Sequence, residues 1–305
     1  MRLIKPQFEI WEQEPEIDGI YKAIEKAGRV CYKSEDKITE DSAKRFVDRM
    51  IASGHGAMLE HGTVYLRVPY PEAYSNLPTD SNWVEDNYSM NPYSVVKGDG
   101  EDYYITSNYR VLVEQGWLDD LKYLCEPTKY HAKRITVKFI LSRSIAQEYT
   151  RHRVFSFAME SQRYCAYNKD KFGNEVTFII PCWLDIRDTD EGREVTRDWN
   201  FDILDGCSII VEEGEFDDAR DAFLTSLNVA EHCYLELLQK GWKPQQAREV
   251  LPNACKTELV MTGFAEDWIN FFKLRTASNA HPQARELAIP LREEFIKRGY
   301  IVDNK

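Results

Sequence analysis

Residues 134–164 read RITVKFILSRSIAQEYTRHRVFSFAMESQRY and hold the clearest structural pattern of the chain. From residue 135 to residue 141 an apolar side chain occupies every second position, which predicts a half-buried β-strand. A helix is predicted to follow, from about Ser142 to about Arg151. The last 14 residues of the stretch contain three arginines, one histidine and two serines. Arginine donates paired hydrogen bonds to phosphate oxygens, so they predict a pocket for a phosphorylated small molecule. A surface network of ion pairs would use the same residues.

The segments on either side predict a protein in which helices outnumber strands. Apolar periodicity predicts helices over 39–53, 217–240, 244–251, 266–275 and 282–297, and strands over 63–68, 177–180 and 256–262. Strand and helix do not alternate regularly, and no internal repeat is present. The predicted class is therefore α+β.

Two stretches differ from the rest in composition. Residues 69–133 hold 9 of the 17 tyrosines and 5 of the 12 prolines, which predicts an irregular insertion with local helix at about 108–124. Residues 185–221 carry 14 acidic side chains against 4 arginines, so most of the net charge of −12 lies there. Such a charge run is usually a solvated surface. The alternative is that acidic side chains are kept away from an anion site elsewhere.

Composition excludes several classes of protein. The 305 residues are 43% hydrophobic and 12% aromatic, which is enough for a packed core. The sequence contains no run of 18 apolar residues, so we expect no membrane-spanning helix, and the first residues do not resemble a secretion signal. A pI near 5.1 argues against a nucleic-acid-binding surface. The seven cysteines include no closely spaced pair, so we expect reduced thiols, a cytoplasmic protein and no metal site.

Two further clusters contain chemically useful side chains. Residues 54–61 read GHGAMLEH, but the third glycine of a dinucleotide-binding loop is missing and the segment precedes a strand. Capping or packing is the simpler interpretation of its two histidines. Residues 247–252, together with Asn270 and Arg275, form the second cluster, for which ordinary surface or ion-pair roles are the alternative.

The arginine-rich motif resembles that of a known enzyme family. Arg151-His152-Arg153, seven further residues and Ser161 resemble the RHR-x7-S motif of the flavin-dependent thymidylate synthases, and the residues up to Tyr164 continue it. Residues 29–32, 55–61, 247–252 and 270–275 resemble other segments of this family, in the same order. The resemblance covers most of 25–68, 134–181 and 219–297.

This resemblance implies both a fold and a reaction. The implied fold is one catalytic domain over 1–305, with a central, mostly antiparallel sheet flanked by helices and with insertions at about 69–133 and 185–221. The implied reaction is the reductive methylation of dUMP to dTMP, with 5,10-methylenetetrahydrofolate as carbon donor, FAD as hydride carrier and NADPH as reductant. The family is typically a homotetramer with active sites where subunits meet.

The resemblance also assigns site residues. The implied FAD-binding residues are His55, Ala57, Glu60, Arg151, His152, Arg153 and Asn270. The implied dUMP-binding residues are Glu148, Arg151, Ser161, Arg163, Arg248 and Arg275. Arg275 is the implied catalytic residue, since a cation at the uracil edge stabilises the negative charge formed there.

Several positions depart from the family pattern. Ala158-Met159 stand where Asn-Glu is usual, and Glu148 stands where glutamine is common. Phe264 and Glu266 stand where asparagine and arginine are found in some members, and Ala57 replaces a threonine. These departures leave open a catalytically impaired, nucleotide-binding homologue. A flavin-free transferase that uses Cys182 is a third hypothesis, although no histidine is adjacent and a structural role is favoured.

Overall fold

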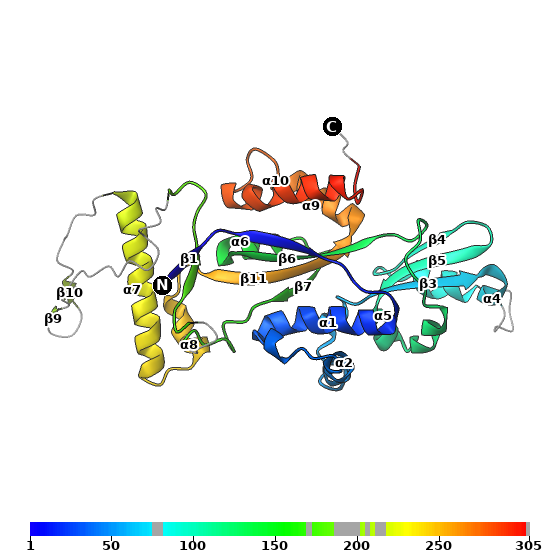
Figure 1. Ribbon diagram of the computed structural model, residues 1–305, viewed down its shortest axis with the longest axis horizontal. Helices are drawn as coiled ribbons and strands as arrows, with labels where there is room; N and C mark the ends of the chain where they lie inside the picture. Colours follow the sequence, from blue (N-terminus) through cyan, green and yellow to red (C-terminus); the bar gives the residue numbers. More distant parts are fainter. Residues whose placement is uncertain (75–81, 169–172, 186–201, 205–207, 211–217, 303–305) are drawn as a thin grey trace. The chain divides into compact units, whose positions relative to one another are not determined.

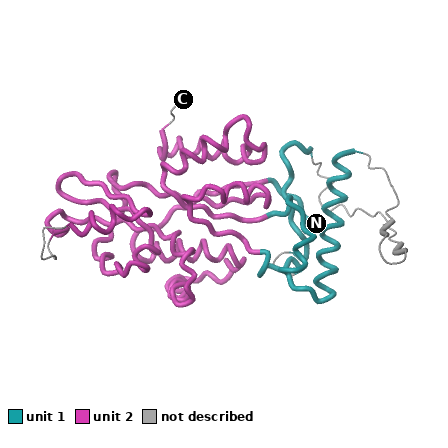
Figure 2. Tube along the Cα trace, turned by 180° about the vertical axis from the view of Figure 1, so that it is seen from behind, with its two compact units in different colours: residues 1–5, 162–256 teal, residues 6–161, 257–305 magenta. Residues whose placement is uncertain are grey.

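The computed structural model describes residues 1–74, 82–168, 173–185, 202–204, 208–210 and 218–302 (Figure 1). These residues form two compact units, which are coloured separately in Figure 2. Unit 1 comprises Met1–Lys5 and Gln162–Lys256, and unit 2 comprises Pro6–Ser161 and Thr257–Lys305. The predicted α+β class with mostly antiparallel strand pairing is confirmed.

A four-stranded sheet lies in unit 2, with its strands in the order β2-β6-β11-β7. β2 pairs antiparallel with β6, and β7 pairs antiparallel with β11. The alternation predicted from residue 135 onward is confirmed, because every second residue of β6 is buried. The strands are β2 (Gln7–Trp11), β6 (Arg134–Ser142), β11 (Lys256–Phe264) and β7 (Ser156–Met159).

Helices cover both faces of this sheet (Figure 1). Leu259 and Met261 of β11 join the largest core, which Trp268 and Phe295 from the C-terminal helices complete. Val260 points to the opposite face, as the period of two in a strand requires, and packs under the first helix. The helices are α1 (Glu16–Tyr32), α6 (Arg143–Tyr149), α9 (Ala265–Arg275) and α10 (Pro282–Lys297).

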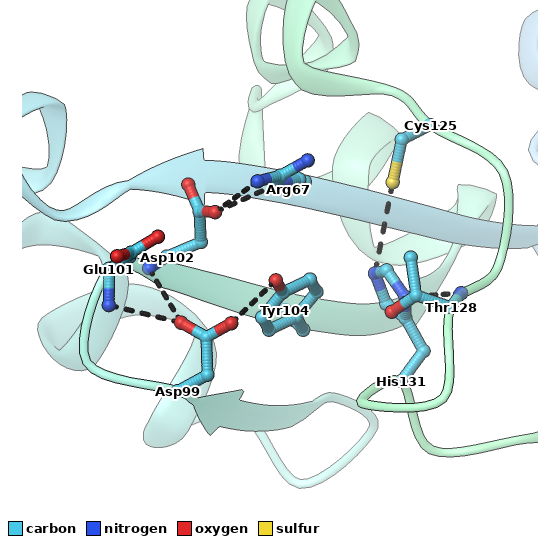
Figure 3. A network of polar contacts seen from close by, with 8 residues as sticks. All are labelled: Arg67, Asp99, Glu101, Asp102, Tyr104, Cys125, Thr128 and His131. Carbon is cyan, nitrogen blue, oxygen red and sulfur yellow. Dashed lines mark hydrogen bonds and ion pairs between the residues drawn. The ribbon is translucent and has the colours of Figure 1, made fainter.

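A second sheet of unit 2 consists of three antiparallel strands in the order β3-β5-β4. Two polar contacts link neighbouring segments of this sheet. Arg67 Nε donates to Asp102 at 2.8 Å, and the Tyr104 hydroxyl donates to Asp99 at 2.8 Å (Figure 3). Short helices complete this part of the unit. The elements are α2 (Ser42–Ala52), α3 (Gly56–Leu59), β3 (Thr63–Pro69), α4 (Tyr70–Tyr74), β4 (Val95–Gly98), β5 (Asp102–Asn108) and α5 (Tyr109–Gln115).

Unit 1 has its own small core. Leu3 and Phe178 lie on a parallel pair of strands, Tyr234 lies on a helix of 21 residues, and all three are buried in this core. Two further strands form an antiparallel pair. The elements are β1 (Arg2–Ile4), β8 (Thr177–Ile179), β9 (Asp202–Leu204), β10 (Ser208–Ile210), α7 (Ala219–Gln239) and α8 (Pro244–Ala247), which a 3-10 turn over Arg248–Val250 follows.

The predicted elements are confirmed, but others were missed. The helices expected over 39–53, 217–240, 266–275 and 282–297 correspond to α2, α7, α9 and α10. The elements that the sequence patterns did not predict are β1, β2, α1, α3, α4, β4, β5, β7, β9 and β10. In the region 69–133 the local helix predicted at about 108–124 is confirmed by α5 and by a 3-10 helix over Leu118–Tyr123, but the irregular structure predicted for the rest is wrong, because this region also supplies β4 and the fully buried β5. Most of the acidic stretch 185–221 lies outside the described residues.

Among the described residues, no helix is both long and apolar enough to cross a membrane.

Candidate active site

Arg275, His152 and Glu148 form a hydrogen-bonded cluster in unit 2. Arg275 is the last residue of α9, Glu148 lies in the last turn of α6, and His152 follows in the next turn. Arg275 Nη1 donates to Glu148 Oε2 at 2.6 Å, and Nη2 donates to the Glu148 carbonyl oxygen at 2.6 Å. The last carbonyls of a helix lack intrahelical donors, so the guanidinium satisfies one of them. The structure thus brings Arg275 to Glu148 and His152, two predicted site residues that lie more than 120 positions before it in the sequence.

His152 is a neutral member of this cluster. Arg275 Nε donates to His152 Nε2 at 3.0 Å, so the ring proton lies on Nδ1. Burial, together with the Arg275 cation, lowers the pKa of His152 to about 4. The ring also packs against Phe271, with 5.0 Å between ring centroids. Near neutral pH, Arg275 is therefore the cation of the cluster, and the Glu148 carboxylate partly balances its charge.

A cavity of about 1160 Å³ lies in unit 2. Its wall includes four phenylalanine and tyrosine rings, among them Phe155 and Phe264. The cationic side chains along it are Lys97, Arg110, Lys133, Arg134 and Arg153, and the acidic ones are Glu60, Glu114, Glu266 and Asp267. The volume exceeds that of most small-ligand pockets, so a ligand as large as a dinucleotide can enter.

Glu60 is held in this wall by two arginines. Arg110 Nη1 from α5 donates to Glu60 Oε1 at 2.5 Å. Arg134 Nη1 from β6 donates to the Glu60 carbonyl oxygen at 3.0 Å. Desolvation by burial lowers the pKa of Arg134 to about 10, which still leaves it positively charged at neutral pH. The predicted residues Glu60 and Arg153 therefore line one cavity that carries several fixed cations.

The cavity residues fit the cofactor that the resemblance implies. Guanidinium groups suit a diphosphate, and aromatic faces suit a planar ring system. The Nε atom of Arg134 is shielded from solvent and has no hydrogen-bond partner among the described residues. A buried donor of this kind is costly unless an acceptor reaches it, which is consistent with a bound anion.

The other predicted cofactor-binding residues lie at the surface of unit 2. His55 occupies the residue before α3 without a capping hydrogen bond from its side chain, and it is exposed, as is Ala57 in the first turn. Arg151 has an exposed side chain, while its backbone N–H donates to the Glu148 carbonyl oxygen at 3.3 Å. Asn270 is exposed on α9. Their assignment to FAD stays a prediction.

The predicted substrate-binding residues fall in both units. Ser161 is half-buried in unit 2, and its N–H donates to the Cys31 carbonyl oxygen at 3.0 Å. Arg163 and Arg248 belong to unit 1. The Arg163 guanidinium lies 5.4 Å from the centre of the Tyr164 ring, and Arg248 Nε lies 3.6 Å from Glu249. Their role in binding dUMP stays a prediction.

Sequence reasoning missed Arg110 and Arg134. Arg134 directly precedes the alternating strand, where a charge at a strand end looks like an ordinary surface residue. Arg110 lies in the region taken for an irregular insertion. No pattern in the sequence marks either arginine as a site residue, and only the fold shows that both arginines meet Glu60.

Comparisons with known proteins agree with the motif. A family model described as thymidylate synthase complementing protein matches residues 129–298, which is more than half of the chain. The flavin-dependent thymidylate synthase of Pyrococcus furiosus is 27% identical over 160 residues, which are 52% of this chain and 53% of that protein. The enzyme of the same name from Corynebacterium aurimucosum is 24% identical over 286 residues, covering 93% of this chain and 79% of that protein.

The extent of these matches varies. The chain spans about half the length of the first curated relatives that it matches. Among solved structures, a UMP/dUMP methylase PolB from Streptomyces cacaoi bound with 5-Br UMP is similar, with a TM-score of 0.42, 18% identity and coverage of 97% of this chain and 92% of that one. By the family model, the chain belongs to the thymidylate synthase complementing proteins, the flavin-dependent thymidylate synthases.

Proposed function

We propose that this protein catalyses the reductive methylation of dUMP to dTMP. In this reaction 5,10-methylenetetrahydrofolate supplies the carbon, and NADPH supplies the reducing equivalents through FAD. Family membership supports the proposal. The observation that carries it is the cluster of Arg275, His152 and Glu148, because the structure brings a fixed cation together with residues that the resemblance assigns to substrate and to cofactor.

Arg275 is the proposed catalytic residue, acting through its charge. Its side chain is 17% exposed, so it faces less water than a surface arginine and its field is less screened. Three acceptors hold the guanidinium before any ligand arrives. A preorganised cation of this kind stabilises the negative charge that the uracil ring carries when C5 becomes nucleophilic.

Glu148 has two proposed tasks. Its Oε2 and its carbonyl oxygen fix the orientation of Arg275. Its Oε1 makes no hydrogen bond within the described part of the chain, and the side chain is 34% exposed. That oxygen is the proposed acceptor for uracil N3–H. Glutamate then does at this position what a glutamine carbonyl would do, while its charge also holds Arg275.

His152 positions Arg275 rather than adding charge. The neutral ring accepts a hydrogen bond from Arg275 Nε and packs against Phe271, and these contacts limit the motion of the guanidinium. A protonated ring would lose this acceptor and repel Arg275. The low pKa of about 4 therefore keeps the cluster intact at neutral pH.

The proposed cofactor site is the cavity beside Glu60 and Arg153. FAD, when bound, supplies the hydride that converts the transferred carbon into a methyl group. The chain's own residues bind and orient it: Arg153 and Glu60 from the cavity wall, with His55, Ala57, Arg151, His152 and Asn270. Ser161, Arg163 and Arg248 are the proposed partners of dUMP, in a cytoplasmic homotetramer whose active sites lie between subunits.

The visible absorbance spectrum of the purified protein tests the cofactor part of this proposal. After incubation with FAD and removal of unbound cofactor, the protein should keep a flavin spectrum, and adding dUMP should perturb it. A protein that retains no FAD under these conditions would refute the proposed function. A flavin-free transferase that uses Cys182 predicts such a colourless protein.

The alternative is a homologue that binds nucleotide without turning it over. The ion pair between Glu148 and Arg275 favours it, because the carboxylate offsets part of the positive charge proposed for catalysis. This alternative predicts that dUMP binds to the FAD-loaded protein while no dTMP forms with both co-substrates present. Formation of dTMP excludes it.

A further inference from the structure

The 69–133 region builds part of the cavity that we assign to the cofactor. This region contributes Lys97 from β4 and Arg110 from α5 to the cavity wall. It lies outside the segments that resemble the family motifs. Its contribution to the cofactor site therefore does not follow from the resemblance.

Two positions of the same cavity lack the polar groups that some family members carry there. Phe264 presents a ring, over which the Arg134 guanidinium lies at 5.6 Å from the ring centre. Glu266 presents a carboxylate to the cavity instead of a guanidinium. At these two positions the wall offers no cation to an anionic ligand, so a cation must come from other positions.

Arg110 is suited to that task by its free donors. A guanidinium carries five N–H groups. Arg110 uses Nε for Glu114 at 2.7 Å and one Nη1–H for Glu60 at 2.5 Å. Three N–H groups remain, on a side chain that is 38% exposed and lines the cavity. The two carboxylates thus orient the guanidinium without saturating it.

Arg134 provides a second cation at the same place. Both arginines bind Glu60, one at its carboxylate and the other at its carbonyl oxygen. The solvent-shielded Nε of Arg134 has no partner among the described residues. Two guanidinium groups with unused donors therefore meet at one residue of the cavity wall, an arrangement that suits the two charged phosphates of a diphosphate.

We propose that Arg110, together with Arg134, binds the diphosphate of the flavin dinucleotide, so that the 69–133 region supplies a cofactor-binding cation in a cavity where Glu266 stands in place of an arginine. This inference rests on the function proposed above. Glu114 weakens the proposed interaction between Arg110 and the diphosphate, because its carboxylate occupies one N–H donor of Arg110 and adds a negative charge beside it.

The test compares the affinity for FAD of four proteins, measured by equilibrium dialysis with flavin fluorescence. Arg110→Ala removes the cation and leaves Glu60 and Glu114 bare. It should raise the Kd for FAD about tenfold or more, the usual effect of losing a hydrogen bond to a charged group. Glu114→Gln frees one donor of Arg110 and removes a competing negative charge, so the Kd of this variant for FAD should fall.

Arg67→Ala is the matched control. Arg67 is an arginine of strand β3 that pairs with Asp102 (Figure 3), and it does not line the cavity. Its Kd should equal that of the wild type.

The outcomes separate this inference from the proposed function. Wild-type protein that binds no FAD overturns the proposed function and this inference with it. Wild-type protein that binds FAD no better than Arg110→Ala overturns this inference alone. An Arg110→Ala variant with unchanged FAD affinity but a raised KM for NADPH overturns it too, because the diphosphate bound there then belongs to the reductant. If Arg110→Ala does not fold, Glu114→Gln decides: a Kd equal to or above the wild-type value overturns the inference.

Discussion

Replacing Arg275 by alanine should abolish most of the activity while the protein stays folded. The variant loses one cation and three hydrogen bonds, two to Glu148 and one to His152. Removing a preorganised group that stabilises charge in a transition state typically costs about 10²–10³ in kcat, or about 2.7–4 kcal/mol. We therefore expect kcat for dTMP formation to fall by about that factor.

The effect of this substitution on stability should be smaller. Glu148 is 34% exposed, so its carboxylate regains water when the ion pair is lost. The carbonyl oxygen lies at a helix end, where water also replaces the donor. A partly exposed ion pair contributes about 1 kcal/mol or less, so the melting temperature should fall by only a few degrees.

The assay combines turnover with a direct probe of the cluster. Steady-state formation of dTMP from dUMP gives kcat, and an NMR titration of the histidines gives the pKa of His152. The removal of a neighbouring cation should raise this pKa from about 4 toward its ordinary value. A kcat within tenfold of the wild-type value, in a variant whose His152 pKa has risen, would refute the catalytic role of Arg275.

Three further predictions concern pH, core packing and helix capping. The pKa of His152 is about 4 in the folded protein and about 6.5 in unfolded chains, so the unfolded state binds more protons between these values and the protein loses stability as pH falls through that window. Urea unfolding at pH 7 and at pH 5 should therefore show a larger loss of unfolding free energy for the wild type than for His152→Gln. Equal losses in the two proteins would contradict the lowered pKa. Trp268→Ala should destabilise unit 2 by about 3–5 kcal/mol, because the ring is fully buried and its Nε1–H donates to the Ile135 carbonyl oxygen, and a change below 1 kcal/mol in chemical denaturation would argue against this packing. Asp218→Ala should cost about 0.5–2 kcal/mol, because the Asp218 side chain accepts from the Asp221 N–H at the start of α7, whereas Asp218→Asn should retain most of the stability.

The sequence predicted the fold best where one face of an element meets water. The strand at 134–142 was visible because buried and half-buried residues alternate along it. β5 was missed because all seven of its residues are buried, which removes the alternation. The tyrosines of this region suggested an irregular segment, although aromatic residues also favour strands.

The first helix was missed for a different reason. Gly19 and Gly28 lie inside α1 and lower its helix propensity. At Gly28 a Cβ atom would come within 2.5 Å of the Phe46 ring, so the glycine allows the close approach of α2. Tertiary packing, which a single sequence does not display, overrides local propensity here.

The candidate site was predicted in its residue types but not in its contacts. The motif led to Glu148, His152 and Arg275, yet the ion pair between the first and the last depends on how α6 and α9 meet. No periodicity encodes that meeting. Arg110 was hidden for the same reason, since its approach to Glu60 depends on the three-stranded sheet and the turn into α5.

The proposed conversion of dUMP to dTMP requires that the carbon transfer be coupled to oxidation of a bound flavin. A single-turnover experiment tests it most directly: FAD-loaded protein is reduced anaerobically with NADPH and then mixed with dUMP and 5,10-methylenetetrahydrofolate. We expect dTMP to form as the flavin is reoxidised, in a ratio of one to one, and we expect omission of dUMP or of the folate to stop dTMP formation. Formation of dTMP by flavin-free protein, or reduced flavin that produces no dTMP with every component present, would contradict it.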